Sequence, residues 1–113
     1  MSGCPFCRIA SGEQGADVVF TNDEVVAFRD IAPKAPVHIL VIPRRHVTSL
    51  AVATPEDGEL LGRLLLAAAE AARRCGVDDG FRVVVNSGSA AGQSVFHIHL
   101  HVLGGRRLAW PPG

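Results

Sequence analysis

The chain of 113 residues has no excess of charge of either sign, because 11 basic residues balance 11 acidic ones. Without a basic surplus or a block of like charge, the sequence favours neither a nucleic-acid partner nor a membrane surface. It also lacks a long apolar run, and residues 1–4 show no secretory signal pattern. Three cysteines, an odd number, fit a reducing cytoplasm. We therefore expect one cytoplasmic domain over residues 1–113, with 48% apolar residues to build a modest core.

Three of the five histidines stand in one alternating stretch. A strand has a period of two, so His97, His99 and His101 would share one face and the apolar residues between them the core face. The predicted core face consists of Phe96, Ile98, Leu100 and Val102. Along such a strand the outer two histidines would lie about 13 Å apart, so one metal ion could hardly bind all three. At least one imidazole is left for acid–base or nucleophilic chemistry.

A small, hydroxyl-rich loop, residues 87–94, leads to these histidines. Glycine and serine allow backbone N–H groups and hydroxyls to approach an anion closely. Most loops of this composition are only turns. Beside a row of histidines, however, the pattern favours nucleophilic attack on phosphorus.

The stretch GQSVFHIHLHVLGG (92–105) resembles the histidine triad motif of the HIT superfamily. Further stretches over 27–46, 81–106 and 110–113 (WPPG) resemble its Hint branch, the purine nucleoside phosphoramidases. The resemblance covers nearly the whole chain and implies a single HIT domain. The implied fold is α+β, with a five-stranded, mainly antiparallel sheet, one long helix and a short N-terminal helical turn. It also implies a homodimer in which the two sheets join and the tail 104–113 contributes to the dimer and active-site region.

The activity implied by the resemblance is hydrolysis of the P–N bond of a purine nucleoside 5′-phosphoramidate. His99 would be the nucleophile and form a nucleotidyl-histidine intermediate. His101 and Ser94 would contact phosphate oxygens or the leaving group, with His97 and His38 in supporting catalytic roles. No cofactor is required for this chemistry, and the expected ligands are purine nucleoside monophosphates and phosphoramidates.

The resemblance also implies a nucleotide-binding set, in which Asp30 accepts hydrogen bonds from the ribose hydroxyls. The expected set is Phe6, Ile9, Phe28, Asp30, Ile31, Leu40, Asn86, Gly92, Gln93, Ser94, His99, His101 and Trp110. Two positions depart from related sequences. Arg29 stands where eukaryotic relatives commonly have histidine, and Phe96 where a tyrosine often stands.

Cys4 and Cys7 form a CxxC pair with three interpretations. A redox pair needs a preceding strand, and only three residues precede Cys4. The cysteines could also be unconnected, buried apolar residues. A zinc site needs two further ligands, and some bacterial HIT proteins complete such a pair with histidines. By that resemblance the set is Cys4, Cys7, His46 and His97, holding a structural Zn²⁺.

The remaining pattern predicts a helical turn over 8–15, strands over 18–21, 24–29, 37–42 and 81–85, and a long helix over 54–74. Thr54 and Pro55 mark its start and Gly76 its C-cap. Its predicted apolar stripe, also a candidate dimer surface, is Leu60, Leu61, Leu64, Leu65, Ala68 and Ala72.

Two other functions remain open. A dinucleoside polyphosphate hydrolase would use the same nucleophile, but that sister branch typically differs at the last triad position and lacks the WPPG ending, so His101 and Trp110 argue against it. A non-catalytic nucleotide- or zinc-binding regulatory module would not need the intact triad with Ser94 and Asp30.

Overall fold

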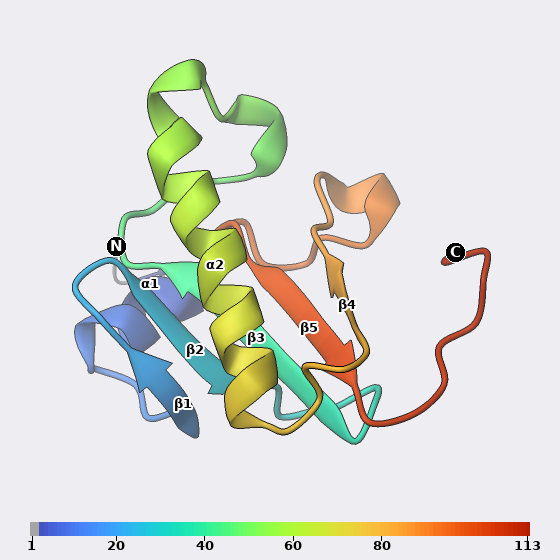
Figure 1. Cartoon of the computed structure of the whole chain (residues 1–113). Helices are drawn as coiled ribbons and strands as arrows, with labels where there is room; N and C mark the ends of the chain where they lie inside the picture. The colour runs from blue at the N-terminus through green and yellow to red at the C-terminus, as the bar shows by residue number, and fades with distance from the viewer. Residues whose placement is uncertain (1–2) are drawn as a thin grey trace.

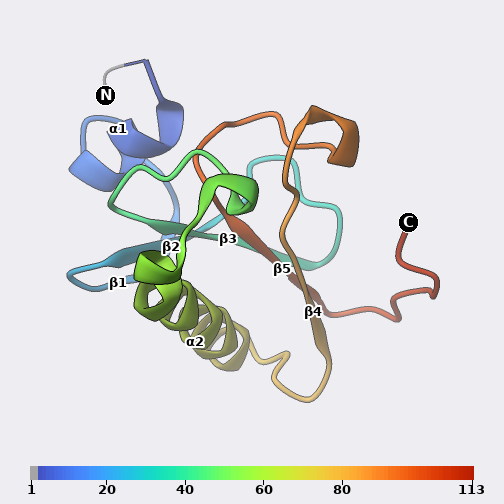
Figure 2. The same ribbon diagram turned by 90° about the horizontal axis from the view of Figure 1, so that it is seen from above.

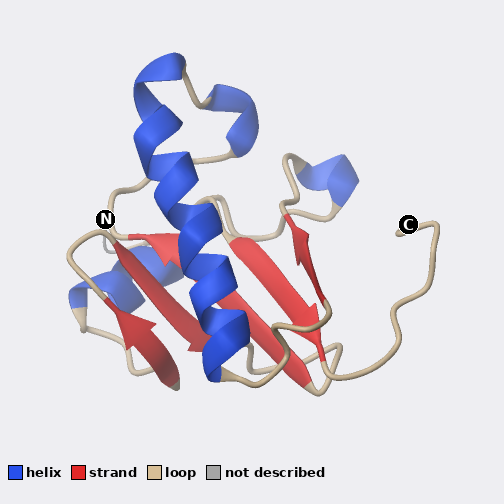
Figure 3. Ribbon diagram, in the orientation of Figure 1, coloured by secondary structure: helices blue, strands red, loops and turns tan. Residues whose placement is uncertain are grey.

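An antiparallel sheet of five strands organises the computed structural model, which describes residues 3–113 (Figures 1 and 3). The strand order is β1-β2-β3-β5-β4, and every neighbouring pair is antiparallel. The strands are β1 (Val18–Thr21), β2 (Val25–Arg29), β3 (Val37–Pro43), β4 (Phe81–Val84) and β5 (Leu100–Gly104). The helices are α1 (Pro5–Ser11) and α2 (Gly58–Arg74), with short 3-10 turns at Leu50–Val52, Pro55–Asp57 and Ser89–Ala91. The predicted α+β architecture is confirmed.

The central strand β3 separates two apolar clusters, one on each face of the sheet. Its residues Ile39 and Val41 pack toward α2, together with Ile98, Leu100 and Val102 from the triad segment. Its residues Leu40 and Ile42 face the other side, where they pack with Phe6 of α1. Seen from above, α2 covers one face and α1 lies on the opposite side (Figure 2). The second face is the one that carries the candidate site.

The helix predicted over 54–74 begins later, because α2 starts at Gly58 and residues 55–57 form a 3-10 turn, but the predicted capping residues act at that turn. Asp57 Oδ2 accepts a hydrogen bond from the Thr54 backbone N–H at 2.9 Å, and Pro55 opens the short 3-10 turn before the helix. Gly76 adopts φ +74, the left-handed conformation expected of a residue that follows a helix end.

The buried face of α2 is narrower than predicted. The buried positions are Leu64, Ala67, Ala68, Ala71 and Ala72, which follow the i, i+3, i+4 spacing of one helix face. Leu65 is 57% exposed, so its place in the predicted stripe is wrong. Each residue advances about 100° around a helix, and Leu65 therefore points well away from the Leu64 face.

The triad strand begins later than predicted, because β5 starts at Leu100 and not at Phe96. Phe96 is 46% exposed and does not belong to the core. The ladder between β3 and β5 ends at the Val41–Leu100 pair. If the same register continued, Ile98 would face Pro43, which has no N–H to donate. Instead, the Ile98 N–H donates to the Val47 carbonyl at 2.6 Å. The alternation holds from Ile98 to Val102 but fails at Phe96.

The N-terminal helix also differs from the predicted turn over 8–15. It begins at Pro5, with Cys4 as its N-cap accepting a hydrogen bond from the Cys7 N–H at 3.4 Å. It ends at Ser11, followed by Gly12 at φ +85. Proline at the first helical position and a sulfur cap explain the earlier start.

The tail after β5 runs along the outside of the molecule to the C-terminus (Figure 1). Trp110 in this tail is 79% exposed, although burial of a large aromatic side chain would be favourable. The Arg82 guanidinium lies 5.7 Å from its ring centre. Within residues 3–113, no helix has the length and apolar character needed to cross a membrane.

Candidate active site

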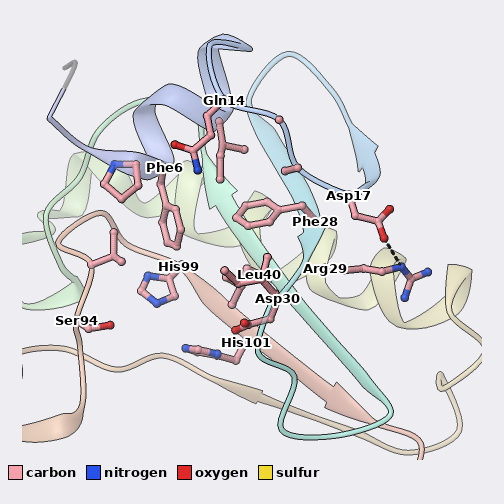
Figure 4. Close-up of a pocket in the computed structure, with 16 residues that line it drawn as sticks. Phe6, Gln14, Asp17, Phe28, Arg29, Asp30, Leu40, Ser94, His99 and His101 are labelled. Atoms are coloured by element: carbon pink, nitrogen blue, oxygen red, sulfur yellow. Dashed lines mark ion pairs between the residues drawn. The ribbon is translucent and has the colours of Figure 1, made fainter.

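A cavity of about 650 Å³ opens on the α1 side of the sheet, a size usual for small-molecule sites (Figure 4). Nine residues expected to be functional line it: Phe6, Ile9, Phe28, Asp30, Ile31, Leu40, Ser94, His99 and His101. Apolar side chains from α1, β2 and β3 form the walls. Histidines from the triad and the carboxylate of Asp30 form the polar end.

His99 is buried on the floor of this cavity, and its tautomer follows from its contacts. Its Nδ1 lies 2.8 Å from the His97 carbonyl oxygen, which can only accept a hydrogen bond. The proton is therefore on Nδ1, and Nε2 carries an unshared electron pair. Phe6 packs edge-on against the ring at a centroid distance of 5.1 Å. An imidazole held in this way offers a nucleophilic nitrogen to the cavity.

His101 takes the opposite tautomer because of His38. The Lys34 backbone N–H donates to His38 Nδ1 at 3.0 Å, so the proton of His38 is on Nε2. That Nε2–H lies 2.9 Å from His101 Nδ1, which must then accept. The remaining His101 nitrogen, Nε2, is a donor. The site thus sets a nucleophilic nitrogen on His99 beside a hydrogen-bond donor on His101. The centroids of these two imidazole rings are 5.0 Å apart.

One carboxylate oxygen of Asp30 is held by a hydrogen bond within the chain. Its Oδ1 accepts from the Ala32 N–H at 2.8 Å, and Oδ2 lies 3.4 Å from His38 Nε2. Burial lowers the pKa of His38 despite the nearby Asp30 carboxylate, so the ring is neutral at pH 7 and its single Nε2 proton is the one that faces His101. An ionised carboxylate has further lone pairs for donors in the cavity.

Four residues of the expected nucleotide-binding set do not line the cavity: Asn86, Gly92, Gln93 and Trp110. Gln93 is buried, and its amide is used within the chain, by the Gly88 N–H at 2.8 Å and the Thr48 carbonyl at 2.8 Å. It holds the loop before the triad. Asn86 lies near Gly92, where a Cβ would meet its amide nitrogen at 4.0 Å. A ligand role for these four stays a prediction.

Sequence reasoning placed the Arg29 charge near the ribose but did not include it in the expected set, and it missed six further lining residues: Pro5, Gln14, Gly15, Ala16, Asp17 and Val95. The segment 12–17 has no periodic pattern and reads only as a turn. Two contacts between Arg29 and Asp17 hold this segment against the cavity. The Arg29 N–H donates to the Asp17 carbonyl at 2.9 Å, and the two side chains form an ion pair at 3.5 Å. No local signal in the sequence indicates that contact.

The expected metal ligands converge beside this site. One ligand atom from each of Cys4, Cys7, His46 and His97 lies within 4.8 Å of every other. The two Nδ1 atoms are 3.2 Å apart, and Cys7 Sγ lies 3.2 Å from His46 Nδ1 and 3.5 Å from His97 Nδ1. A zinc ion with bonds of about 2.0 Å to nitrogen and 2.3 Å to sulfur gives tetrahedral edges of roughly 3.3–3.8 Å. These donors therefore fit a metal of this kind.

The donor chemistry of His97 agrees with that fit. Its Nε2 lies 2.8 Å from the Pro43 carbonyl and donates to it, which leaves Nδ1 unprotonated for a ligand bond. Burial lowers the pKa of His97, which favours the neutral ring that a metal requires. The carbonyl of the same residue orients His99. The cluster and the cavity are therefore joined through one residue.

A pH dependence follows from His101. Burial first, and then the neighbouring His99 and His38, lower its pKa from 6.5 to about 4. A lowered folded pKa means that the unfolded chain binds a proton first, so the stabilisation is present above pH 6.5 and is lost as the pH falls from 6.5 toward 4. We expect histidine-selective NMR titration to give a His101 midpoint near 4, and His101→Asn to weaken the acid destabilisation in this window. A His101 midpoint near 6.5 would contradict the buried arrangement.

Fold and site together define an α+β protein whose antiparallel sheet carries a triad of histidines at an apolar cavity. The sequence model of the HIT domain matches residues 11–108, and the chain belongs to this histidine triad family. An uncharacterized HIT-like protein of Synechocystis sp. is 51% identical over 96% of this chain and 95% of its own length.

Solved structures agree with this assignment. A HIT family hydrolase from Legionella pneumophila matches with a TM-score of 0.95 and 48% identity, over 97% of this chain and 99% of that one. A zinc-bound histidine triad family protein from Mycobacterium smegmatis matches with a TM-score of 0.79 and 35% identity, over 99% of this chain and 81% of that one.

Proposed function

We propose that the protein is a hydrolase that cleaves the P–N bond of purine nucleoside 5′-phosphoramidates. The observation that carries the proposal is the pairing of tautomers, a free Nε2 on His99 beside a donating Nε2–H on His101, at one end of an apolar cavity. Membership of the HIT family supports it. Relatives from Legionella pneumophila and Clostridium thermocellum carry the name hydrolase.

The cavity suits a nucleoside with its phosphate at the histidines. Phe6, Phe28 and Leu40 offer apolar surfaces to a purine face, and Asp30 offers acceptors to adjacent ribose hydroxyls. The phosphate then lies against His99, with Ser94 at the cavity edge and His101 as donors to its oxygens. Such donors stabilise the charge that develops on phosphorus oxygens during displacement.

The reaction proceeds in two displacements. His99 Nε2 forms a bond to phosphorus while the P–N bond breaks, and the amine leaves with a proton. Water then attacks phosphorus, the bond to His99 breaks, and the nucleoside monophosphate is released. Covalent catalysis divides one difficult displacement into two easier ones. Because the pKa of His101 is lowered to about 4, this residue is neutral at pH 7 and places no second positive charge beside the imidazolium that forms when His99 bonds to phosphorus.

Zinc and a second copy of the chain complete the proposal. Cys4, Cys7, His46 and His97 would hold a structural Zn²⁺, which supplies a fixed cross-link between α1 and the triad segment and no catalytic step. The exposed tail with Trp110 and the open edge of β4 would join a partner subunit in a homodimer.

Turnover of adenosine 5′-phosphoramidate tests the function directly. We expect release of AMP, followed by chromatography, at a rate well above that from diadenosine tetraphosphate under the same conditions. Faster cleavage of the dinucleotide would favour the polyphosphate hydrolase instead. Binding of AMP without turnover of either substrate would indicate a nucleotide-binding module.

A further inference from the structure

One polar side chain stands at the end of the cavity that the histidines do not occupy. Gln14 belongs to the turn between α1 and β1 and lines the same cavity as His99. In Figure 4 its amide points toward Phe6, while Asp30 and His101 lie at the opposite end. Its neighbours Gly15 and Ala16 bring no polar side chain to this wall. Gln14 is thus placed where a ligand's edge farthest from the triad would lie.

The orientation of the Gln14 amide is set by Arg8. The Arg8 guanidinium Nε donates to Gln14 Oε1 at 3.3 Å, and the Gln14 backbone N–H donates to the Arg8 carbonyl at 3.1 Å. A guanidinium has no acceptor, so the amide oxygen faces Arg8 and the NH₂ group faces away from it. Within residues 3–113, no acceptor contacts Gln14 Nε2. The group that Gln14 offers to the cavity is therefore a hydrogen-bond donor.

The other charged groups at this end are engaged with each other. Asp17 Oδ2 lies 3.5 Å from Arg29 Nε, and the Arg29 N–H donates to the Asp17 carbonyl at 2.9 Å. These contacts hold the far side of the turn, as Arg8 holds its near side. Gln14 consequently sits on a segment fixed at both ends, which is what a residue needs to select among ligands.

The consequence for a ligand rests on the proposed function. With the phosphate at His99 and the ribose at Asp30, the six-membered ring of a purine is the part that extends farthest toward Gln14. Guanine and hypoxanthine carry a carbonyl oxygen, O6, beside the acceptor N7, whereas adenine carries a donating amino group there. We propose that Gln14 is a specificity-determining residue that donates to O6 and favours 6-oxopurine nucleotides over adenine nucleotides.

Binding of three nucleoside monophosphates to the full chain tests this inference without any turnover. By calorimetry, we expect GMP and IMP to bind about fivefold more tightly than AMP, as one hydrogen bond at a partly exposed site would give. IMP separates the effect of O6 from that of the guanine 2-amino group. Gln14→Met should bring the three affinities together, since it keeps the length of the side chain and removes both donors.

A variant that reverses the order of the IMP and AMP affinities makes the test specific. Gln14→Glu replaces the donor by an acceptor of the same shape, so AMP should now bind more tightly than IMP. A change in folding or in general pocket shape would weaken all three ligands and would not invert their order. Glu13→Gln is the matched control, because Glu13 neighbours Gln14 but does not line the cavity, and it should keep the wild-type order.

The outcomes separate this inference from the function on which it rests. Equal binding of IMP and AMP by the wild type, or an unchanged order in Gln14→Glu, would overturn the role of Gln14 and leave the hydrolase proposal standing. Failure of all three nucleotides to bind would overturn both.

Discussion

Replacement of His99 by alanine should lower the rate of P–N cleavage by at least about 10⁴-fold, because the variant has no nucleophile for the first displacement. His99 is the triad residue whose free nitrogen faces the cavity, since its Nδ1 is committed to the His97 carbonyl at 2.8 Å. Release of AMP from adenosine 5′-phosphoramidate, measured at saturating substrate, gives the comparison. The affinity for AMP should change far less, because the apolar walls and Asp30 remain.

Two controls make this result interpretable. His99→Gly leaves space beside Phe6 for free imidazole, and partial recovery of turnover on adding imidazole would show that the lost group is a nucleophile. Wild-type enzyme mixed with substrate and quenched in alkali should carry a nucleotide on His99, detectable by mass spectrometry, because phosphorus–imidazole bonds survive base better than acid. A His99→Ala variant within tenfold of the wild-type rate would rule out this mechanism.

Removal of the metal should destabilise the protein and also lower its rate of P–N cleavage. A ligand that binds only the folded state at a hundredfold its dissociation constant contributes about 2.7 kcal/mol, and tighter zinc binding contributes more. We expect one zinc per chain by elemental analysis and a clear fall in Tm on adding a strong chelator. The Cys4→Ser, Cys7→Ser double variant should have the low Tm already and should not respond to the chelator.

Activity should fall in the same variant through two contacts. Phe6 lies between the two cysteines in sequence and packs against the rings of both His97 and His99, at 6.0 and 5.1 Å. The His97 carbonyl orients the His99 ring. The Cys75→Ser variant is the matched control, since this third cysteine is outside the cluster and should keep both zinc and activity. The zinc site would be refuted if the wild-type protein, purified with zinc present, contained no zinc and if its Tm did not change on adding the chelator.

Patterns of short range allowed much of the fold to be predicted. The apolar run of β3, the hairpin of β1 and β2, and the cap that Thr54 and Asp57 form on the turn before α2 all depend on neighbours within a few residues. In the triad strand a distant contact prevailed over the local pattern. Phe96 has the strand period but is exposed, because the ladder with β3 ends at Val41 and Leu100 and the Ile98 N–H bonds to the Val47 carbonyl instead.

The sequence by itself determined which chemical groups the site contains: three alternating histidines, a carboxylate at a strand end, and two cysteines in a CxxC pair. Only the tertiary structure decided what each group does with its protons and partners. Cys4 and His97 are 93 residues apart, and His38 and His101 are 63 apart, yet these contacts assemble the metal ligands and set the tautomers. A hydrogen bond assigns a proton to one ring nitrogen or the other, and its partner is chosen by the packing of the sheet. Gln14 follows the same principle at shorter range, since Arg8 donates to its oxygen and leaves its NH₂ group for a ligand.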